Sequence, residues 1–128
     1  MRNRRLYREG GATNTGLSGE KTKTLLDNTT STIKIGEKDR DRSLTVWYTI
    51  AKDLTEHTMS GSWLVINQTA DVEVVDDEQS FRDSDGPIDG LTITAQFNGN
   101  DIELVIVANG VGENMKMTYE YGNLKIAD

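Results

Sequence analysis

The chain has 128 residues, no cysteine and a formal net charge of −7 at pH 7. This length gives room for a single domain. The absence of cysteine excludes disulfides, thiolate zinc sites and a cysteine nucleophile. No stretch approaches the ~20 consecutive apolar residues that a membrane span needs, so no membrane partner is expected. No apolar segment follows the positively charged start of the chain, and a secretory signal is therefore not expected either.

Charge divides the chain into two parts. Residues 1–23 carry six basic and two acidic side chains, whereas residues 24–128 carry eight basic and nineteen acidic ones. We therefore expect an extended basic arm over residues 1–23 and one folded acidic domain over residues 24–128. An acidic domain favours solubility and disfavours contact with phosphate backbones.

The start of the arm has the composition of a protein-binding segment. Guanidinium groups suit carboxylates on a neighbouring protein, and they also suit nucleic-acid phosphates. Nucleic acid is the less favoured partner, because neither interleaved aromatic residues nor a groove-reading helix accompanies the arginines. The predicted anchor residues are Arg2, Arg4, Arg5, Leu6, Tyr7 and Arg8.

After the arm, apolar and polar residues alternate with a period of two, which is typical of half-buried strands. Asn98 and Gly99 stand between two such runs and form a strong hairpin signal. The chain therefore predicts an all-β fold, a single antiparallel β-sandwich of about eight strands with a jelly-roll-like arrangement, and leaves the strand order open. The predicted strands cover residues 32–35, 44–50, 63–66, 72–74, 91–97, 102–107, 115–121 and 124–126.

Trp47 is out of phase with the other apolar residues of its strand. Leu44, Val46, Tyr48 and Ile50 share one face, so Trp47 points to the opposite face of its sheet. A large apolar side chain on that face predicts either a covered surface or a subunit contact.

Two groups of polar residues were considered as chemical sites. The acidic connection over residues 76–90 partly echoes a calcium loop, but it lacks that pattern's spacing and terminal glutamate, so a solvated loop is favoured and no metal site is predicted. His57, the one histidine, lies in a polar connection with no local nucleophile or orienting partner. We therefore expect neither an enzyme nor a bound cofactor.

Five segments of the predicted domain carry a resemblance to a known family. They are residues 25–30 (LLDNTT), 46–50 (VWYTI), 60–65 (SGSWLV), 98–104 (NGNDIEL) and 115–121 (MKMTYEY). Together they resemble a β-sandwich module of tailed-bacteriophage virions, which is found in head-decorating, head-fibre and tail-fibre-associated proteins. The resemblance implies a structural role without catalytic residues, often as a trimer, with the module displayed on the particle surface.

The sequence thus predicts a virion accessory protein that is made in the host cytoplasm and joined to a capsid or portal-proximal protein by its arm. We expect it to be a homo-oligomer, with a trimer favoured. One alternative is a receptor- or carbohydrate-binding module that uses residues 52–61 and 76–90. A second alternative is an internal virion protein that contacts nucleic acid through the arm.

Overall fold

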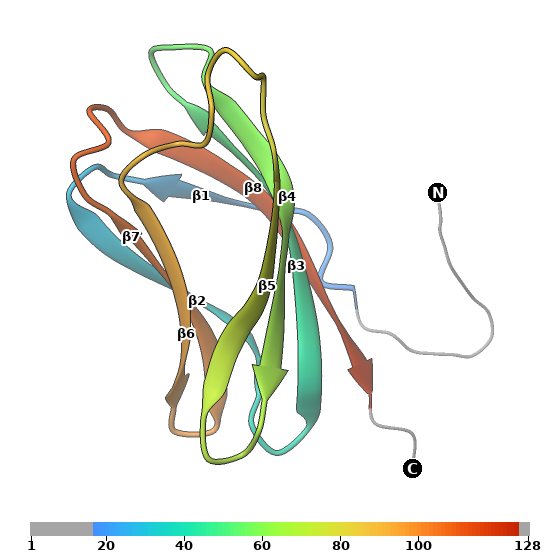
Figure 1. Cartoon of the computed structure of the whole chain (residues 1–128). Helices are drawn as coiled ribbons and strands as arrows, with labels where there is room; N and C mark the ends of the chain where they lie inside the picture. The colour runs from blue at the N-terminus through green and yellow to red at the C-terminus, as the bar shows by residue number, and fades with distance from the viewer. Residues whose placement is uncertain (1–16, 126–128) are drawn as a thin grey trace.

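The computed structural model describes residues 17–125, and these form strands and connections only (Figure 1). The predicted anchor residues 2–8 lie outside the described residues. Among residues 17–125, no helix is long and apolar enough to cross a membrane. The strands are β1 (Lys21–Leu25), β2 (Thr29–Glu37), β3 (Asp41–Lys52), β4 (Thr58–Asn67), β5 (Val72–Ser80), β6 (Leu91–Asn98), β7 (Asp101–Ala108) and β8 (Met115–Lys125).

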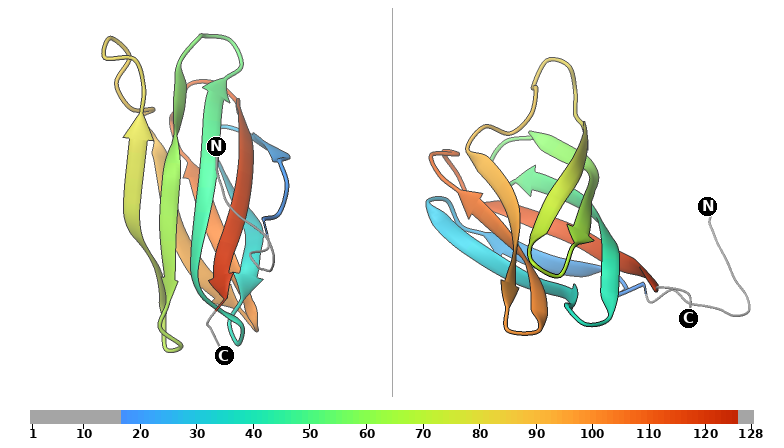
Figure 2. Two further views of the ribbon diagram at one scale, coloured as in Figure 1. Left: turned by 90° about the vertical axis from the view of Figure 1, so that its right-hand side faces the viewer. Right: turned by 60° about the horizontal axis from the view of Figure 1, so that its bottom comes forward.

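The eight strands form two antiparallel sheets that pack face to face (Figures 1 and 2). The larger sheet has the order β1-β8-β3-β4-β5, and the smaller has the order β2-β7-β6. The predicted antiparallel β-sandwich is therefore confirmed. As in a jelly roll, the first strand pairs with the last and the second with the next to last. The pattern then changes, because β3, β4 and β5 form a meander within the larger sheet.

The first strand was not predicted. Lys21, Thr22 and Lys23 were assigned to the arm, yet they belong to β1 and pair with β8. Their side chains are mostly exposed, and only Leu25 of this strand is fully buried. An edge strand with so little to bury lacks the alternating pattern of apolar and polar residues, which is why it was not predicted. Because β1 begins at Lys21, the folded domain begins earlier than residue 24.

The last strand is longer than predicted. Residues 115–121 and 124–126 were expected to be two strands, but β8 runs without a break from Met115 to Lys125. It lies between β1 and β3, and it pairs with β1 over residues 115–119 and with β3 over residues 115–125. The predicted number of eight strands still holds, because two predicted strands form the single strand β8 and the unpredicted strand β1 is added.

Alternation along the strands builds the core, as expected. Trp63 is fully buried and stacks on Tyr48, with the ring centroids 3.9 Å apart. Burying side chains of this size stabilises the fold by about 1.5–3 kcal/mol each. Other buried residues from the two facing sheets include Leu44, Val46, Ile50, Val65, Ile102, Leu104, Ile106, Met115 and Met117.

A buried carboxylate holds the end of the sandwich that carries the β2–β3 turn. Asp41 is fully buried. It accepts hydrogen bonds from the backbone N–H of Glu37 at 2.8 Å and from Arg40 at 2.9 Å, and the amide of Asn123 also donates to it. Gly36 makes room for it, since a Cβ there would lie 2.7 Å from the Asp41 Oδ2.

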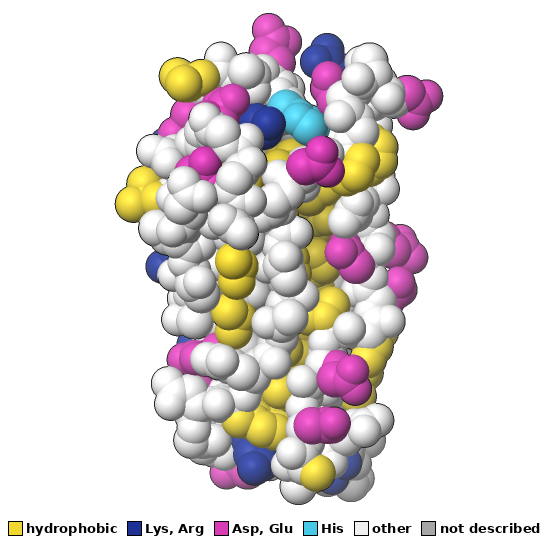
Figure 3. Space-filling model, turned by 60° about the vertical axis from the view of Figure 1, so that its left-hand side comes forward, with side chains coloured by type: hydrophobic (Ala, Val, Ile, Leu, Met, Phe, Trp, Pro, Cys, Tyr) yellow, Lys and Arg dark blue, Asp and Glu magenta, His cyan; other side chains and the backbone are white. Residues whose placement is uncertain are grey.

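The two sheets do not match in width, and one side of the sandwich is left open. The smaller sheet ends at β6, and β5 of the larger sheet is exposed from Val75 to its last residue. The inward-facing side chains of β6 are only partly buried. Figure 3 views this side and shows a line of hydrophobic side chains bordered by acidic ones.

Candidate functional site on the outer face of the larger sheet

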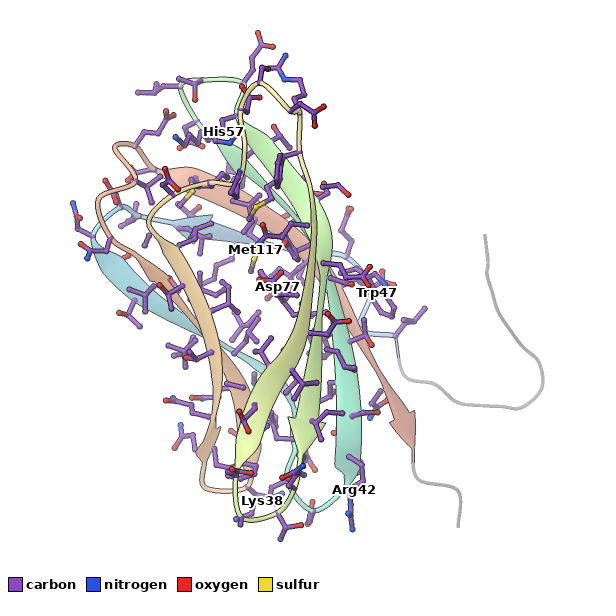
Figure 4. The ribbon with its side chains drawn as sticks, in the orientation of Figure 1. Lys38, Arg42, Trp47, His57, Asp77 and Met117 are labelled. Atoms are coloured by element: carbon purple, nitrogen blue, oxygen red, sulfur yellow. The ribbon has the colours of Figure 1, made fainter. Side chains whose placement is uncertain are left out.

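Trp47 lies on the outer face of the five-stranded sheet, as its phase predicts. Its side chain is 46% exposed, and its neighbours across β3 are Ser62 of β4 and Glu120 of β8. Figure 4 shows Trp47 on the side of the sheet that faces away from the core. The predicted subunit contact through Trp47 stays a prediction.

Hydroxyl groups surround the indole. A shallow depression of about 270 Å³ lies on one side of Trp47 and is bordered by the carboxyl-bearing residues Glu20 and Glu120. The Thr49 and Ser60 hydroxyls form a 2.8 Å hydrogen bond within this depression. The period of two in β8 places Glu120 on the outer face, but nothing local in the sequence indicates that Glu20 joins it.

A second depression, of about 300 Å³, lies on the other side of Trp47 and is more apolar. Leu17 and Leu64 line it together with Trp47. Leu17 is held there because the N–H of Ser18 donates to the carbonyl of Tyr121 at 2.8 Å, and the Tyr121 N–H donates back to the Ser18 hydroxyl at 3.0 Å. The chain before residue 17 is therefore joined to the domain beside Trp47, which the sequence did not indicate.

We expect Trp47→Thr to change the free energy of unfolding by less than about 1 kcal/mol, because the side chain is half exposed and threonine already occupies this face of β3. Trp63→Thr is the matched comparison, and we expect it to cost more than about 3 kcal/mol because Trp63 is fully buried. Urea unfolding of the two variants checks this. A loss above about 2 kcal/mol for Trp47→Thr would show that the indole is an integral part of the packed domain.

The loops at the β3–β4 end of the sandwich are fixed to one another by carboxylates. Asp27, in the β1–β2 turn, accepts the N–H groups of Val111 at 2.9 Å and Gly112 at 2.8 Å. These bonds, from Gly112 first and then Val111, lower the pKa of Asp27 below its ordinary value, because they favour the charged form.

Two further contacts connect loops at this end. Glu113 accepts the backbone N–H of Leu54 and the hydroxyl of Thr55, the latter at 3.0 Å. The N–H of Leu54 is the largest cause of a lowered pKa at Glu113. His57 Nε2 lies 2.8 Å from the carbonyl oxygen of Gly86 and so joins the β3–β4 loop to the β5–β6 loop. His57 therefore has a structural partner.

The predicted acidic loop over residues 76–90 is partly a strand in the structure. Asp76, Asp77 and Glu78 are part of strand β5 rather than of a loop, and β4 already begins at Thr58. Successive side chains of a strand point to opposite faces, which places Asp77 on the face opposite to Asp76 and Glu78. Within residues 17–125, no three histidine, aspartate or glutamate side chains gather in a way that could hold a metal ion.

No protein-family model, no curated protein and no solved structure matches the chain.

Proposed function

We propose that this chain is a non-enzymatic structural protein of a tailed-phage virion. Its basic N-terminal arm and the Trp47 face together attach it to a capsid or portal-proximal protein, and the sandwich is displayed on the particle surface. The observation that carries the proposal is the position of Leu17, which lines the same depression as Trp47. The arm and the exposed indole thus start from the same place and can act as one attachment surface.

The distribution of charge supports this arrangement. The four arginines of residues 2–8 are joined to a domain in which acidic residues outnumber basic ones. The core of the domain is built from residues between Leu25 and Tyr119, so it does not depend on the arginines of the arm. Arginine–carboxylate contacts with a neighbouring subunit would give these arginines a use.

The acidic groups with lowered pKa values also fit a structural protein. Asp27, Asp41 and Glu113 each accept hydrogen bonds that hold two or more segments of the domain together. Shifted pKa values often mark catalytic groups, but ion-pair and turn networks shift them too. The hydrogen-bond partners here favour the second origin.

The receptor-binding alternative has less support. The loops proposed for it are partly strand, and two of their side chains, Thr55 and His57, are engaged in contacts with neighbouring loops. Binding of a receptor at this end would compete with those contacts.

Deleting residues 2–16 is the test, since a deletion to residue 23 would also remove part of β1. We expect the shortened chain to keep its melting temperature within a few degrees and to lose at least tenfold in occupancy on phage particles, measured by quantitative gel analysis of purified virions. A variant with Arg2, Arg4, Arg5 and Arg8 replaced by glutamine is the length-matched control and should show most of the same loss. Undiminished occupancy of the shortened chain would contradict the proposal.

A further inference from the structure

The two outermost strands of the larger sheet, β1 and β5, each have a free edge. Within residues 17–125, β1 pairs only with β8 and β5 only with β4. The left view of Figure 2 shows the two strands on opposite sides of the sheet. The unpaired N–H and C=O groups of an edge strand are a template for another strand, and the side chains beside them decide which strand is accepted.

The second half of β5 makes few side-chain contacts within its own domain. Residues 76–80 pair with residues 60–64 of β4 in a regular register, after an irregularity at Val75. Every residue from Val75 to Ser80 is exposed, so side-chain burial contributes little to this stretch. Its extended conformation rests on backbone pairing with β4, and its other edge is open to a second strand.

The two free edges carry opposite charges. Residues 76–78 of β5 are all acidic and this strand has no basic residue, whereas β1 contains Lys21 and Lys23 and no acidic residue. Asp77 accepts a hydrogen bond from Gln79 at 3.1 Å, which leaves its negative charge in place. Within residues 17–125, no basic side chain forms an ion pair with these three carboxylates.

These charges distinguish between the possible pairings of two copies. Joining β1 to β1, or β5 to β5, around a two-fold axis would bring like charges together, which is destabilising. Joining β1 of one copy to β5 of the next brings lysines to carboxylates. The charges therefore favour a head-to-tail contact.

The directions and lengths of the strands fit such a contact. Neighbouring strands in the order β1-β8-β3-β4-β5 are all antiparallel, so β1 and β5 run in the same direction. A copy rotated about an axis along the strands therefore presents its β1 parallel to β5 of its neighbour. Strand β1 has five residues, and the exposed stretch 76–80 of β5 has the same length.

The faces of the two strands fix the register. Lys23 lies opposite Met117 of β8, and Asp77 lies opposite Trp63 of β4. Met117 and Trp63 are fully buried, and residues directly opposite one another point to the same face, so Lys23 and Asp77 both lie on the core side of the sheet. A joined sheet with a continuous core side can thus place Lys23 beside Asp77.

We propose that the free edge of β1 pairs in parallel with residues 76–80 of β5 in a second copy of this chain, with Lys23 beside Asp77. The two threonines of β1 then lie beside the other two carboxylates on the outer face, where their hydroxyls donate to them. Backbone hydrogen bonds provide the attraction. The charges choose the partner edge, since exposed ion pairs by themselves add little affinity.

This contact goes beyond the proposed function. Neither residues 2–8 nor Trp47 takes part in it. A head-to-tail contact closes into a ring when the rotation between copies allows it, and a ring presents several attachment surfaces at once. The proposed function is tested by particle occupancy and this contact by self-association of the purified chain, so either can fail while the other stands.

Charge reversal in the full-length chain tests the inference. In the β1 variant, Lys21 and Lys23 are both replaced by glutamate, and in the β5 variant residues 76–78 are all replaced by lysine. We expect the wild-type chain to self-associate in sedimentation velocity. Each variant alone should associate at least tenfold more weakly, because its two edges have the same sign. An equimolar mixture should associate to within about threefold of the wild type, because each edge of one variant meets an opposite edge of the other.

Three exposed acids outside the strands provide a control with the same change in charge as the β5 variant. They are Asp53, Asp83 and Asp89, each replaced by lysine in one chain. This control should associate to within about threefold of the wild type. The inference is overturned if the wild-type chain stays monomeric at about 1 mM. It is also overturned if the control loses as much association as the β5 variant, or if the mixture of the two edge variants does not associate.

Disulfide trapping checks the register without any reversed charge, since the chain has no cysteine of its own. One copy carries Thr24→Cys and another carries Glu78→Cys, both on the outer face of their strands. Under oxidising conditions we expect a mixed disulfide-linked dimer on a non-reducing gel. With Gln79→Cys in place of Glu78→Cys, the side chain lies on the core face and we expect at least tenfold less. Equal yields from the two positions, or none from either, contradict the proposed pairing.

Discussion

Gly61→Ala is expected to destabilise the protein by more than about 3 kcal/mol, the largest effect of any single methyl group that we identify. A Cβ at Gly61 would lie 1.8 Å from the carbonyl oxygen of Glu78 and 3.1 Å from the Tyr48 hydroxyl. The first atom is backbone of the adjacent strand, so β4 and β5 would have to separate. Overpacking in a close-packed interior costs 1–3 kcal/mol when side chains alone must shift, and backbone displacement adds to this.

Gly99→Ala is the matched control for Gly61→Ala. Gly99 has a φ of 62°, and a Cβ there meets nothing within 4 Å. Its replacement should cost only the left-handed backbone strain, about 1–2 kcal/mol. Urea unfolding followed by circular dichroism gives both values. Similar losses at the two positions would show that the close approach of β4 and β5 is relieved by a small adjustment.

Asp41→Asn is expected to lower the free energy of unfolding by about 2–3 kcal/mol, because it removes a buried charge that accepts several hydrogen bonds. Arg40, which loses its ionic partner, is half exposed and regains water. Asp39→Asn is the control, since Asp39 is an exposed neighbour in the same turn and should change stability by less than about 0.5 kcal/mol.

The same variant should alter the response to acid. Burial by itself would raise the pKa of Asp41, but the bonds from Arg40, the Glu37 N–H and Asn123 outweigh it and hold the pKa below its ordinary value. A carboxyl whose pKa is lower in the folded state stabilises the fold above about pH 4, and this contribution is lost as the pH falls through the folded-state pKa. We expect unfolding free energies measured from pH 7 to pH 2.5 to fall less steeply at the acid end in Asp41→Asn. Parallel curves would contradict this.

Strands with one buried face could be predicted from the sequence. Residues 44–50 lie within β3 with Leu44, Val46, Tyr48 and Ile50 buried, and Trp47 faces outward as its phase requires. The Asn98–Gly99 signal marks the turn between β6 and β7, where Gly99 has the positive φ that a tight hairpin turn uses.

Strands that bury little could not be predicted in this way. In β1 only Leu25 is fully buried, and in β5 the residues from Val75 onward are exposed on both faces. These strands are held by backbone pairing with one neighbour, and backbone pairing has no side-chain period. In the sequence, residues 76–78 therefore have the pattern of an acidic loop, and only their pairing with β4 shows that they belong to a strand.

The residues that define the sites depend on partners far away in the chain. Asp41 accepts a hydrogen bond from Asn123, and Leu17 lines one depression together with Trp47 and Leu64. Asp41 had the local appearance of an ordinary turn residue, and the arm gave no indication of where it joins the domain.

The amino-acid order by itself determined the all-β class, the inward and outward faces of the central strands, and the division of charge between the first residues and the rest. Those properties are local, because side-chain direction alternates along each strand whatever the strand pairs with. The tertiary structure alone decided the order of strands, the burial of Asp41, the place of Leu17 beside Trp47, and the open side between β5 and β6. Each of these arises from contacts between segments that are distant in the chain, and no local pattern records which segments will meet.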